Sequence, residues 1–133
     1  MDPRRETFDH QTVWNDFAAE ADMIIEVIDL LVRDLPISVK ALLAGAKSGD
    51  LTAVGRAAHK VVGAAGTMAA DPICELGRAI ELRAREGSLD AVRTLCEPVS
   101  NACDRLIADL TAWRNELARV MQHDGDSVQS CRS

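Results

Sequence analysis

The apolar positions of this chain recur every three or four residues over most of its length, which is the spacing of one face of an α-helix. No segment shows the alternation of apolar and polar residues that is typical of a half-buried strand. The pattern therefore predicts an all-α protein. The clearest run lies in residues 22–47 and consists of Ile24, Ile25, Ile28, Leu31, Leu35, Val39, Leu42 and Leu43.

Capping and turn residues divide this pattern into five helices. The segment SGDL at 48–51 combines a glycine suited to a helix C-terminus with an aspartate suited to the next N-cap. Asp71-Pro72 has an N-cap residue followed by proline at the first helical position, and GS at 87–88 is a further stop and start. Pro36 falls inside the second helix, which we expect it to kink or restart, and Pro98 falls inside the last helix, where it could cause a bend. The predicted helices cover about residues 9–21, 22–47, 51–70, 72–86 and 89–120.

Links this short require consecutive helices to pack antiparallel. We therefore predict an antiparallel up-down four-helix bundle with an additional N-terminal helix, whose apolar face is Val13, Trp14 and Phe17. Its 133 residues are enough for one domain. We expect a flexible lead at 1–8, the bundle at 9–120 and a disordered polar tail at 121–133.

Composition and charge exclude several classes of partner. The net charge is −6 and no cluster of Lys and Arg stands out, so nucleic acid and anionic membrane surfaces are not expected partners. No apolar run is long enough to span a bilayer, and the N-terminal residues lack the apolar segment of a signal peptide. We therefore expect a cytoplasmic protein that contacts no membrane.

The four cysteines form no CxxC pair. Cys96 and Cys103 are seven residues apart, on one stripe of a helix, and Cys74 lies early in another helix. We interpret them as free thiols that pack as small hydrophobes rather than as a metal site or a disulfide scaffold.

The helix at 51–70 places one histidine among glycines on its outer face. Its core stripe is expected to contain Leu51, Val54, Ala58, Val61, Ala65 and Met68. At about 100° per residue, His59 lies roughly 130° from the centre of that stripe. Gly55 and Gly63 lie about 40° to either side of His59, and Gly66 about 20° away. Each glycine inside a helix costs about 1 kcal/mol relative to alanine.

These glycines have two possible explanations, which are close packing by a helix of the same chain and close approach by another protein. They could allow a neighbouring helix to pack closely, but they lie on the face turned away from the core stripe. Alternatively, another protein approaches His59 until its own reactive group touches the ring. A neutral imidazole is a good nucleophile near pH 7. We favour the second explanation.

The segment AAHKVVGAAGTMAA resembles the signature of histidine-containing phosphotransfer (HPt) domains, with His59 followed by Gly63 four residues later and a small residue at Gly66. The flanking segments ALLAGAKSGDLTAVGRAAH and LGRAIELRAREGSLDAV are similar to the family as well, the latter with Ile80-Glu81 as a hydrophobic–acidic pair. The resemblance covers about residues 20–115.

The resemblance implies a phosphorelay carrier that is phosphorylated on His59, through the outer ring nitrogen. It implies as partners the receiver domains of response regulators or hybrid histidine kinases, which would supply Mg²⁺. The chain itself would bind no cofactor. Docking would use the surface of Gly55, Val62, Gly63 and Gly66. No ATP-binding signature is present, so self-phosphorylation is not expected.

The chain departs from the family pattern beside the histidine. The family usually has HxxKG, with a lysine that can hold phosphoryl oxygens, whereas this position is Val62 here. Lys60 is the nearest lysine, about 100° round the helix from His59, and Arg56 is about 60° away. Since arginine can bind phosphate through two N–H groups, Arg56 is a candidate for phosphate stabilisation, with Lys60 as the second. The frequent glycine ten residues after the histidine is Ala69 here.

Two other functions stay open from the sequence. The chain could be a non-transferring HPt-like module that regulates a receiver or kinase by binding, or a plain helical oligomerisation domain. An enzyme with its own active site is not expected. Glu75, Glu81 and Glu86 are interpreted as solvated helix faces, and His10 and His123 as incidental.

Overall fold

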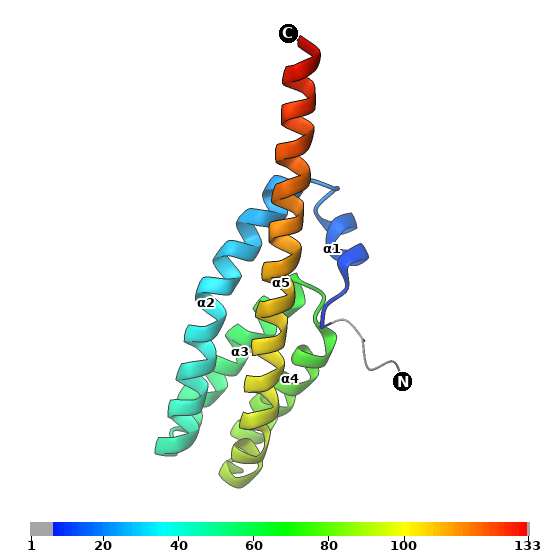
Figure 1. Ribbon diagram of the computed structural model, residues 1–133. Helices are drawn as coiled ribbons and strands as arrows, with labels where there is room; N and C mark the ends of the chain where they lie inside the picture. The colour runs from blue at the N-terminus through cyan, green and yellow to red at the C-terminus, as the bar shows by residue number, and fades with distance from the viewer. Residues whose placement is uncertain (1–6, 133) are drawn as a thin grey trace.

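The computed structural model describes residues 7–132 of the chain, and side chains as far as Gln122. Within this range it is all helical, as predicted, with no strand. Figure 1 shows the five helices. They are α1 (His10–Asp16), α2 (Ala21–Ser48), α3 (Leu51–Thr67), α4 (Asp71–Arg85) and α5 (Leu89–Arg132).

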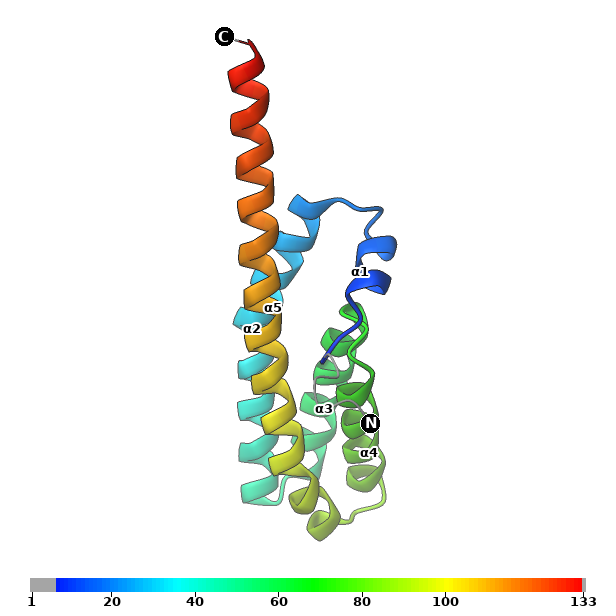
Figure 2. The same ribbon diagram turned by 45° about the vertical axis from the view of Figure 1, so that its right-hand side comes forward.

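Helices α2 to α5 form the predicted up-down bundle, in which each helix runs antiparallel to the next (Figure 2). Helix pairs α2–α3, α3–α4, α4–α5 and α2–α5 are in contact, so the four helices close a ring around one core. The predicted stripe of α3 is confirmed, because Val54, Ala58, Val61, Ala65 and Met68 are fully buried. Leu51 packs half-buried against the same core.

The predicted joints lie where the capping residues indicate. Gly49 and Gly87 both adopt the left-handed conformation, with φ of 80° and 79°. The Asp50 side chain accepts a hydrogen bond of 3.1 Å from the backbone N–H of Ala53, as expected of an N-cap. The turn at Gly49-Asp50 joins α2 to α3, and the turn at Gly87 joins α4 to α5.

The turn between α3 and α4 differs from the prediction. Helix α3 ends at Thr67 instead of Ala70, because Ala69 adopts a left-handed backbone with φ of 52°. The N-cap of α4 is Ala70 rather than Asp71, and Pro72 lies in the first turn. The turn buries Met68 and Ala70 completely, and this burial accounts for the early end of α3.

The N-terminal helix is shorter than the predicted 9–21. It ends at Asp16, and Ala18 and Ala19 both have left-handed φ values, so the chain bends before α2 begins. Of the predicted flexible lead, residues 1–6 lie outside the described part, but Phe8 belongs to the core with only 3% of its surface exposed. The Asp9 N–H donates a 3.2 Å hydrogen bond to the Ala69 carbonyl and so ties this segment to the α3–α4 turn.

The long helices continue through their prolines. Helix α2 does not restart at Pro36, and α5 passes Pro98 and extends helically to Arg132, beyond the predicted end near Val120 (Figure 1). Side chains after Gln122, and Ser133 altogether, lie outside the described residues. The segment 121–133 is predicted as a disordered tail, and the structure differs from this prediction because the backbone is helical as far as Arg132. No described helix is long and apolar enough to cross a membrane.

Candidate functional site

His59 lies on the outer face of α3, as the helical wheel predicts, and 81% of its side-chain surface is exposed. Its Nδ1 atom is 3.5 Å from Oε2 of Glu81 on the antiparallel helix α4. The Glu81 side chain is only 21% exposed, so the carboxylate is held against the bundle while the imidazole projects from it. The opposite ring nitrogen, Nε2, is the atom left for chemistry with an incoming group.

Glu81 is the residue of this site that sequence reasoning missed. It was interpreted as part of a solvated helix face, yet it is the acidic partner of His59. The signal that could have found it is the hydrophobic–acidic pair Ile80-Glu81. Ile80 is fully buried, so the next residue lies at the border between core and solvent.

The three glycines around His59 have no neighbours that require them. A Cβ atom built on Gly55, Gly63 or Gly66 would meet no other atom within 4 Å. Close packing inside the described chain therefore does not explain them. It does explain Gly77 of α4, where a Cβ would lie 2.6 Å from Cγ2 of Val62.

Val62 lies on the flank of α3 that faces α4. Its side chain is half-buried over Gly77, and its carbonyl is 3.8 Å from the Cys74 thiol. The structure thus places Val62 at the border of the predicted docking surface, with Gly63 and Gly66 fully on its exposed side. The docking role of these residues stays a prediction.

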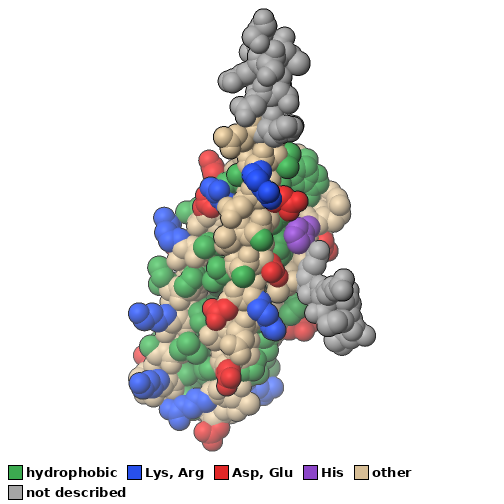
Figure 3. Space-filling view, viewed as in Figure 1, with side chains coloured by type: hydrophobic (Ala, Val, Ile, Leu, Met, Phe, Trp, Pro, Cys, Tyr) green, Lys and Arg blue, Asp and Glu red, His purple; other side chains and the backbone are tan. Residues whose placement is uncertain are grey.

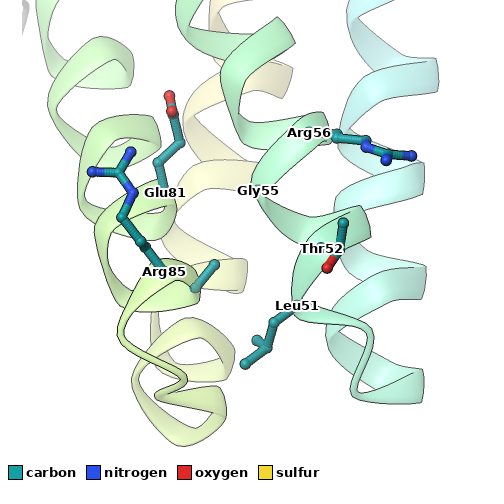
Figure 4. A pocket seen from close by; sticks show the side chains of 7 residues that line it. Leu51, Thr52, Gly55, Arg56, Glu81 and Arg85 are labelled. Atoms are coloured by element: carbon teal, nitrogen blue, oxygen red, sulfur yellow. The ribbon is translucent and has the colours of Figure 1, made fainter.

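The two predicted phosphate-stabilising residues, Arg56 and Lys60, line different grooves on opposite sides of α3. Lys60 lines an apolar groove between α2 and α3, together with residues such as Leu30 and Ala64. Arg56 lines a second groove, between α3 and α4, with Gly55, Glu81 and Arg85. In Figure 4, Arg56 points away from α4, whereas Arg85 extends along α4 towards the level of Glu81.

Elsewhere on the surface, charges of both signs are present. On the face seen in Figure 3, most Lys and Arg side chains lie along the left edge and the lower end, and Asp and Glu side chains lie mainly over the middle. Among the described side chains, no three His, Cys, Asp or Glu residues form a group that could hold a metal ion.

The described cysteines are free thiols, as predicted. Cys74 and Cys103 are buried and Cys96 is half-buried, while the Cys131 side chain lies outside the described residues. Burial raises the pKa of Cys103 to about 12 and also raises the pKa values of Cys74 and Cys96. These thiols are protonated near neutral pH, which suits a packing role rather than nucleophilic chemistry.

Comparison with known proteins decides the family of this helical bundle. The model of the Hpt domain family matches residues 12–123, which is most of the chain. The chain belongs to the Hpt domain family. Proteins of this family are phosphocarriers of two-component systems that interact with receiver domains, and in general they are not kinases.

A solved structure has the same fold as this HPt protein. The histidine-containing phosphotransfer protein B (HptB) of Pseudomonas aeruginosa PAO1 superposes with a TM-score of 0.78 at 20% sequence identity. The match covers 84% of this chain and 97% of HptB. No curated protein matches the chain in sequence.

Proposed function

We propose that this HPt protein carries a phosphoryl group on His59 between the aspartyl residues of receiver domains in a two-component phosphorelay. The receivers belong to response regulators or hybrid histidine kinases, and the carrier is cytoplasmic. The observation that supports this most is the arrangement around His59. An exposed imidazole has one nitrogen beside a carboxylate and stands among positions where no side chain obstructs an approaching protein.

The Glu81 carboxylate orients the chemistry of the imidazole. A carboxylate beside one ring nitrogen favours the tautomer with the proton on that nitrogen. The carboxylate thus favours a proton on Nδ1, which is 3.5 Å from Glu81, and a lone pair on Nε2. The 3.5 Å separation is longer than a normal hydrogen bond, so the effect of Glu81 is chiefly electrostatic.

The transfer step then needs no general base. The Nε2 lone pair attacks the phosphorus of an aspartyl phosphate on the receiver, and an N–P bond forms as the P–O bond to the aspartyl carboxylate breaks. The released aspartate keeps the electron pair, and the ring retains its Nδ1 proton and becomes cationic. Glu81 stabilises that cation. In the reverse step a receiver aspartate attacks phosphorus and the N–P electrons return to Nε2.

The glycines allow the two proteins to come close enough for this step. Reacting atoms must approach to about 3–3.5 Å, which requires the receiver surface to lie directly on α3. A side chain at Gly55, Gly63 or Gly66 would project into the space that this surface must enter. The proposal assigns Mg²⁺ to the receiver, and to this chain the role of a carrier without ATP-dependent kinase activity.

Phosphoryl transfer from a phosphorylated receiver domain tests the proposal. We expect label on the wild type, with the acid lability of an N–P bond, and none on His59→Gln. His10→Gln is the matched control, since His10 packs against Phe8 and Trp113 at the start of α1, and its substitution should leave labelling intact. Label that persists in His59→Gln would contradict the proposal.

Val62 is the observation that favours a second candidate function. A valine where the family usually has lysine would suit a module that binds a receiver or kinase and regulates it without transfer. Receiver binding of equal affinity by the wild type and His59→Gln, with no label on either, would favour this second function.

A further inference from the structure

A phosphoryl group on His59 would be placed beside a carboxylate. The group carries about −1.5 to −2 charge at neutral pH, and Glu81 is 3.5 Å from the other nitrogen of the same ring. The cationic ring lies between these two negative groups and offsets part of their repulsion, and a further cation beside the phosphoryl oxygens would offset the rest. Which cation of the chain serves this purpose is a question that the geometry of α3 and α4 can answer.

The cations of α3 and α4 differ in what they contact. Arg83 is already paired with Glu86 at 2.6 Å. Lys60 faces the groove on the α2 side of α3, where Asp34 is also present. Arg78 does not line the groove that contains Glu81. None of these three lines the groove that contains Glu81.

Arg56 and Arg85 remain, and both line the groove that contains Glu81. Figure 4 separates them, because the Arg56 side chain points away from α4 whereas Arg85 extends along α4 towards the level of Glu81. Arg85 forms no ion pair or hydrogen bond within the described part of the chain. Its guanidinium is therefore available to a ligand without breaking an existing contact.

The register of the two helices places Arg85 one helical turn from the level of the histidine. Arg85 follows Glu81 by one helical turn, and Gly55 precedes His59 by one turn on the antiparallel helix, so the two occupy the same level. One turn is about 5.4 Å, which is within the reach of an arginine side chain. A Cβ at Gly55 would meet nothing within 4 Å, so the groove is open at this position.

We propose that Arg85 is the residue that binds the phosphoryl oxygens on His59, from α4, and that it offsets the repulsion by Glu81. This inference rests on the proposed function, because it requires phosphorylation of His59. A guanidinium can donate two parallel N–H bonds to phosphoryl oxygens, and a position on the neighbouring helix leaves the approach to Nε2 open. Arg85 contacts the transferred group but takes no electrons or proton in the step.

Phosphorylation with phosphoramidate tests this without a receiver. The ³¹P signal of the phosphohistidine is titrated with pH in the wild type and in Arg85→Ala, Arg85→Lys, Arg56→Ala and Arg83→Ala. We expect Arg85→Ala to raise the pKa of the phosphoryl group by about half a unit to one unit, because a nearby cation favours the more charged form. Arg85→Lys should retain part of the shift. Arg56→Ala and Arg83→Ala remove the same charge and should match the wild type.

The outcomes separate the two proposals. A wild type without any phosphohistidine signal beyond that of His59→Gln would defeat the proposed function, and this inference with it. A clear wild-type signal with an unchanged titration in Arg85→Ala would overturn the role of Arg85 alone. A shift in Arg56→Ala instead would also overturn it and assign the phosphoryl contact to α3. Thermal unfolding of each variant checks that the bundle is intact.

Discussion

The glycines that face the inside of this bundle leave no room for a side chain, whereas those that face away from it have open space around them. A Cβ at Gly45 of α2 would lie 3.0–3.3 Å from three atoms of the α3 N-terminus, and one at Gly77 would lie 2.6 Å from Val62. A Cβ at Gly55, Gly63 or Gly66 would meet nothing within 4 Å. The same residue type is thus required by packing at two positions and by nothing within the described chain at three.

The difference identifies the surface on which another molecule is expected. Each outward glycine costs about 1 kcal/mol of helix stability relative to alanine, in a domain whose total stability is typically about 5–15 kcal/mol. The inward glycines offset this cost through close contact between helices. The outward ones have no such compensation in the described chain, and they surround His59, whose side chain is exposed.

Gly77→Ala should produce the largest loss of stability. The added methyl group would overlap Cγ2 of Val62, and the stiff χ1 of valine limits its ability to move. We expect the free energy of unfolding to fall by about 1–3 kcal/mol, measured by urea denaturation. In a Val62→Ala background, where the overlapping methyl group is absent, Gly77→Ala should lower the free energy of unfolding much less than it does in the wild type. A Gly77→Ala protein as stable as the wild type would show that the helices separate easily here.

Gly63→Leu should instead slow transfer without destabilising the bundle. The leucine would project into open space beside His59, where the receiver surface is expected to lie. We expect the rate of phosphoryl transfer from a receiver to fall at least about tenfold, which corresponds to about 1.4 kcal/mol. Ala112→Leu, at an exposed position of α5, is the control and should transfer normally. Normal transfer by Gly63→Leu would remove Gly63 from the docking surface.

The parts of the fold that sequence predicts well are those with a local cause. The helices and the buried stripe of α3 follow from the spacing of apolar residues, and the caps at Gly49 and Asp50 follow from local backbone chemistry. The exposure of His59 follows from the same spacing, since it needs only the orientation of one helix.

The parts that sequence predicts poorly depend on contacts between segments. Ala18, Ala19 and Ala69 adopt left-handed conformations, although alanine is the best helix former. The turn containing Ala69 is fixed by burial of its neighbours and by the hydrogen bond from Asp9, neither of which is visible in a local pattern. The contact between Glu81 and His59 is of the same kind. It depends on the register of α4 against α3, which periodicity within either helix does not reveal.

The smallest expected effect is also the most direct test of the contrast between the two kinds of glycine. Gly55→Ala, Gly63→Ala and Gly66→Ala should each raise the free energy of unfolding by about 0.5–1 kcal/mol, because alanine favours the helix and its methyl group meets nothing. Urea denaturation measures this, and Gly77→Ala, with the same exchange at a packed position, is the control of opposite sign.

The three alanine variants together should be more stable than the wild type and transfer phosphate more slowly. That combination would show that the glycines serve contact with a partner. The substitutions would stabilise the isolated chain and slow only its reaction with another protein. Unchanged stability would mean that these glycines cost the helix nothing. The need for an external surface to account for them would then disappear.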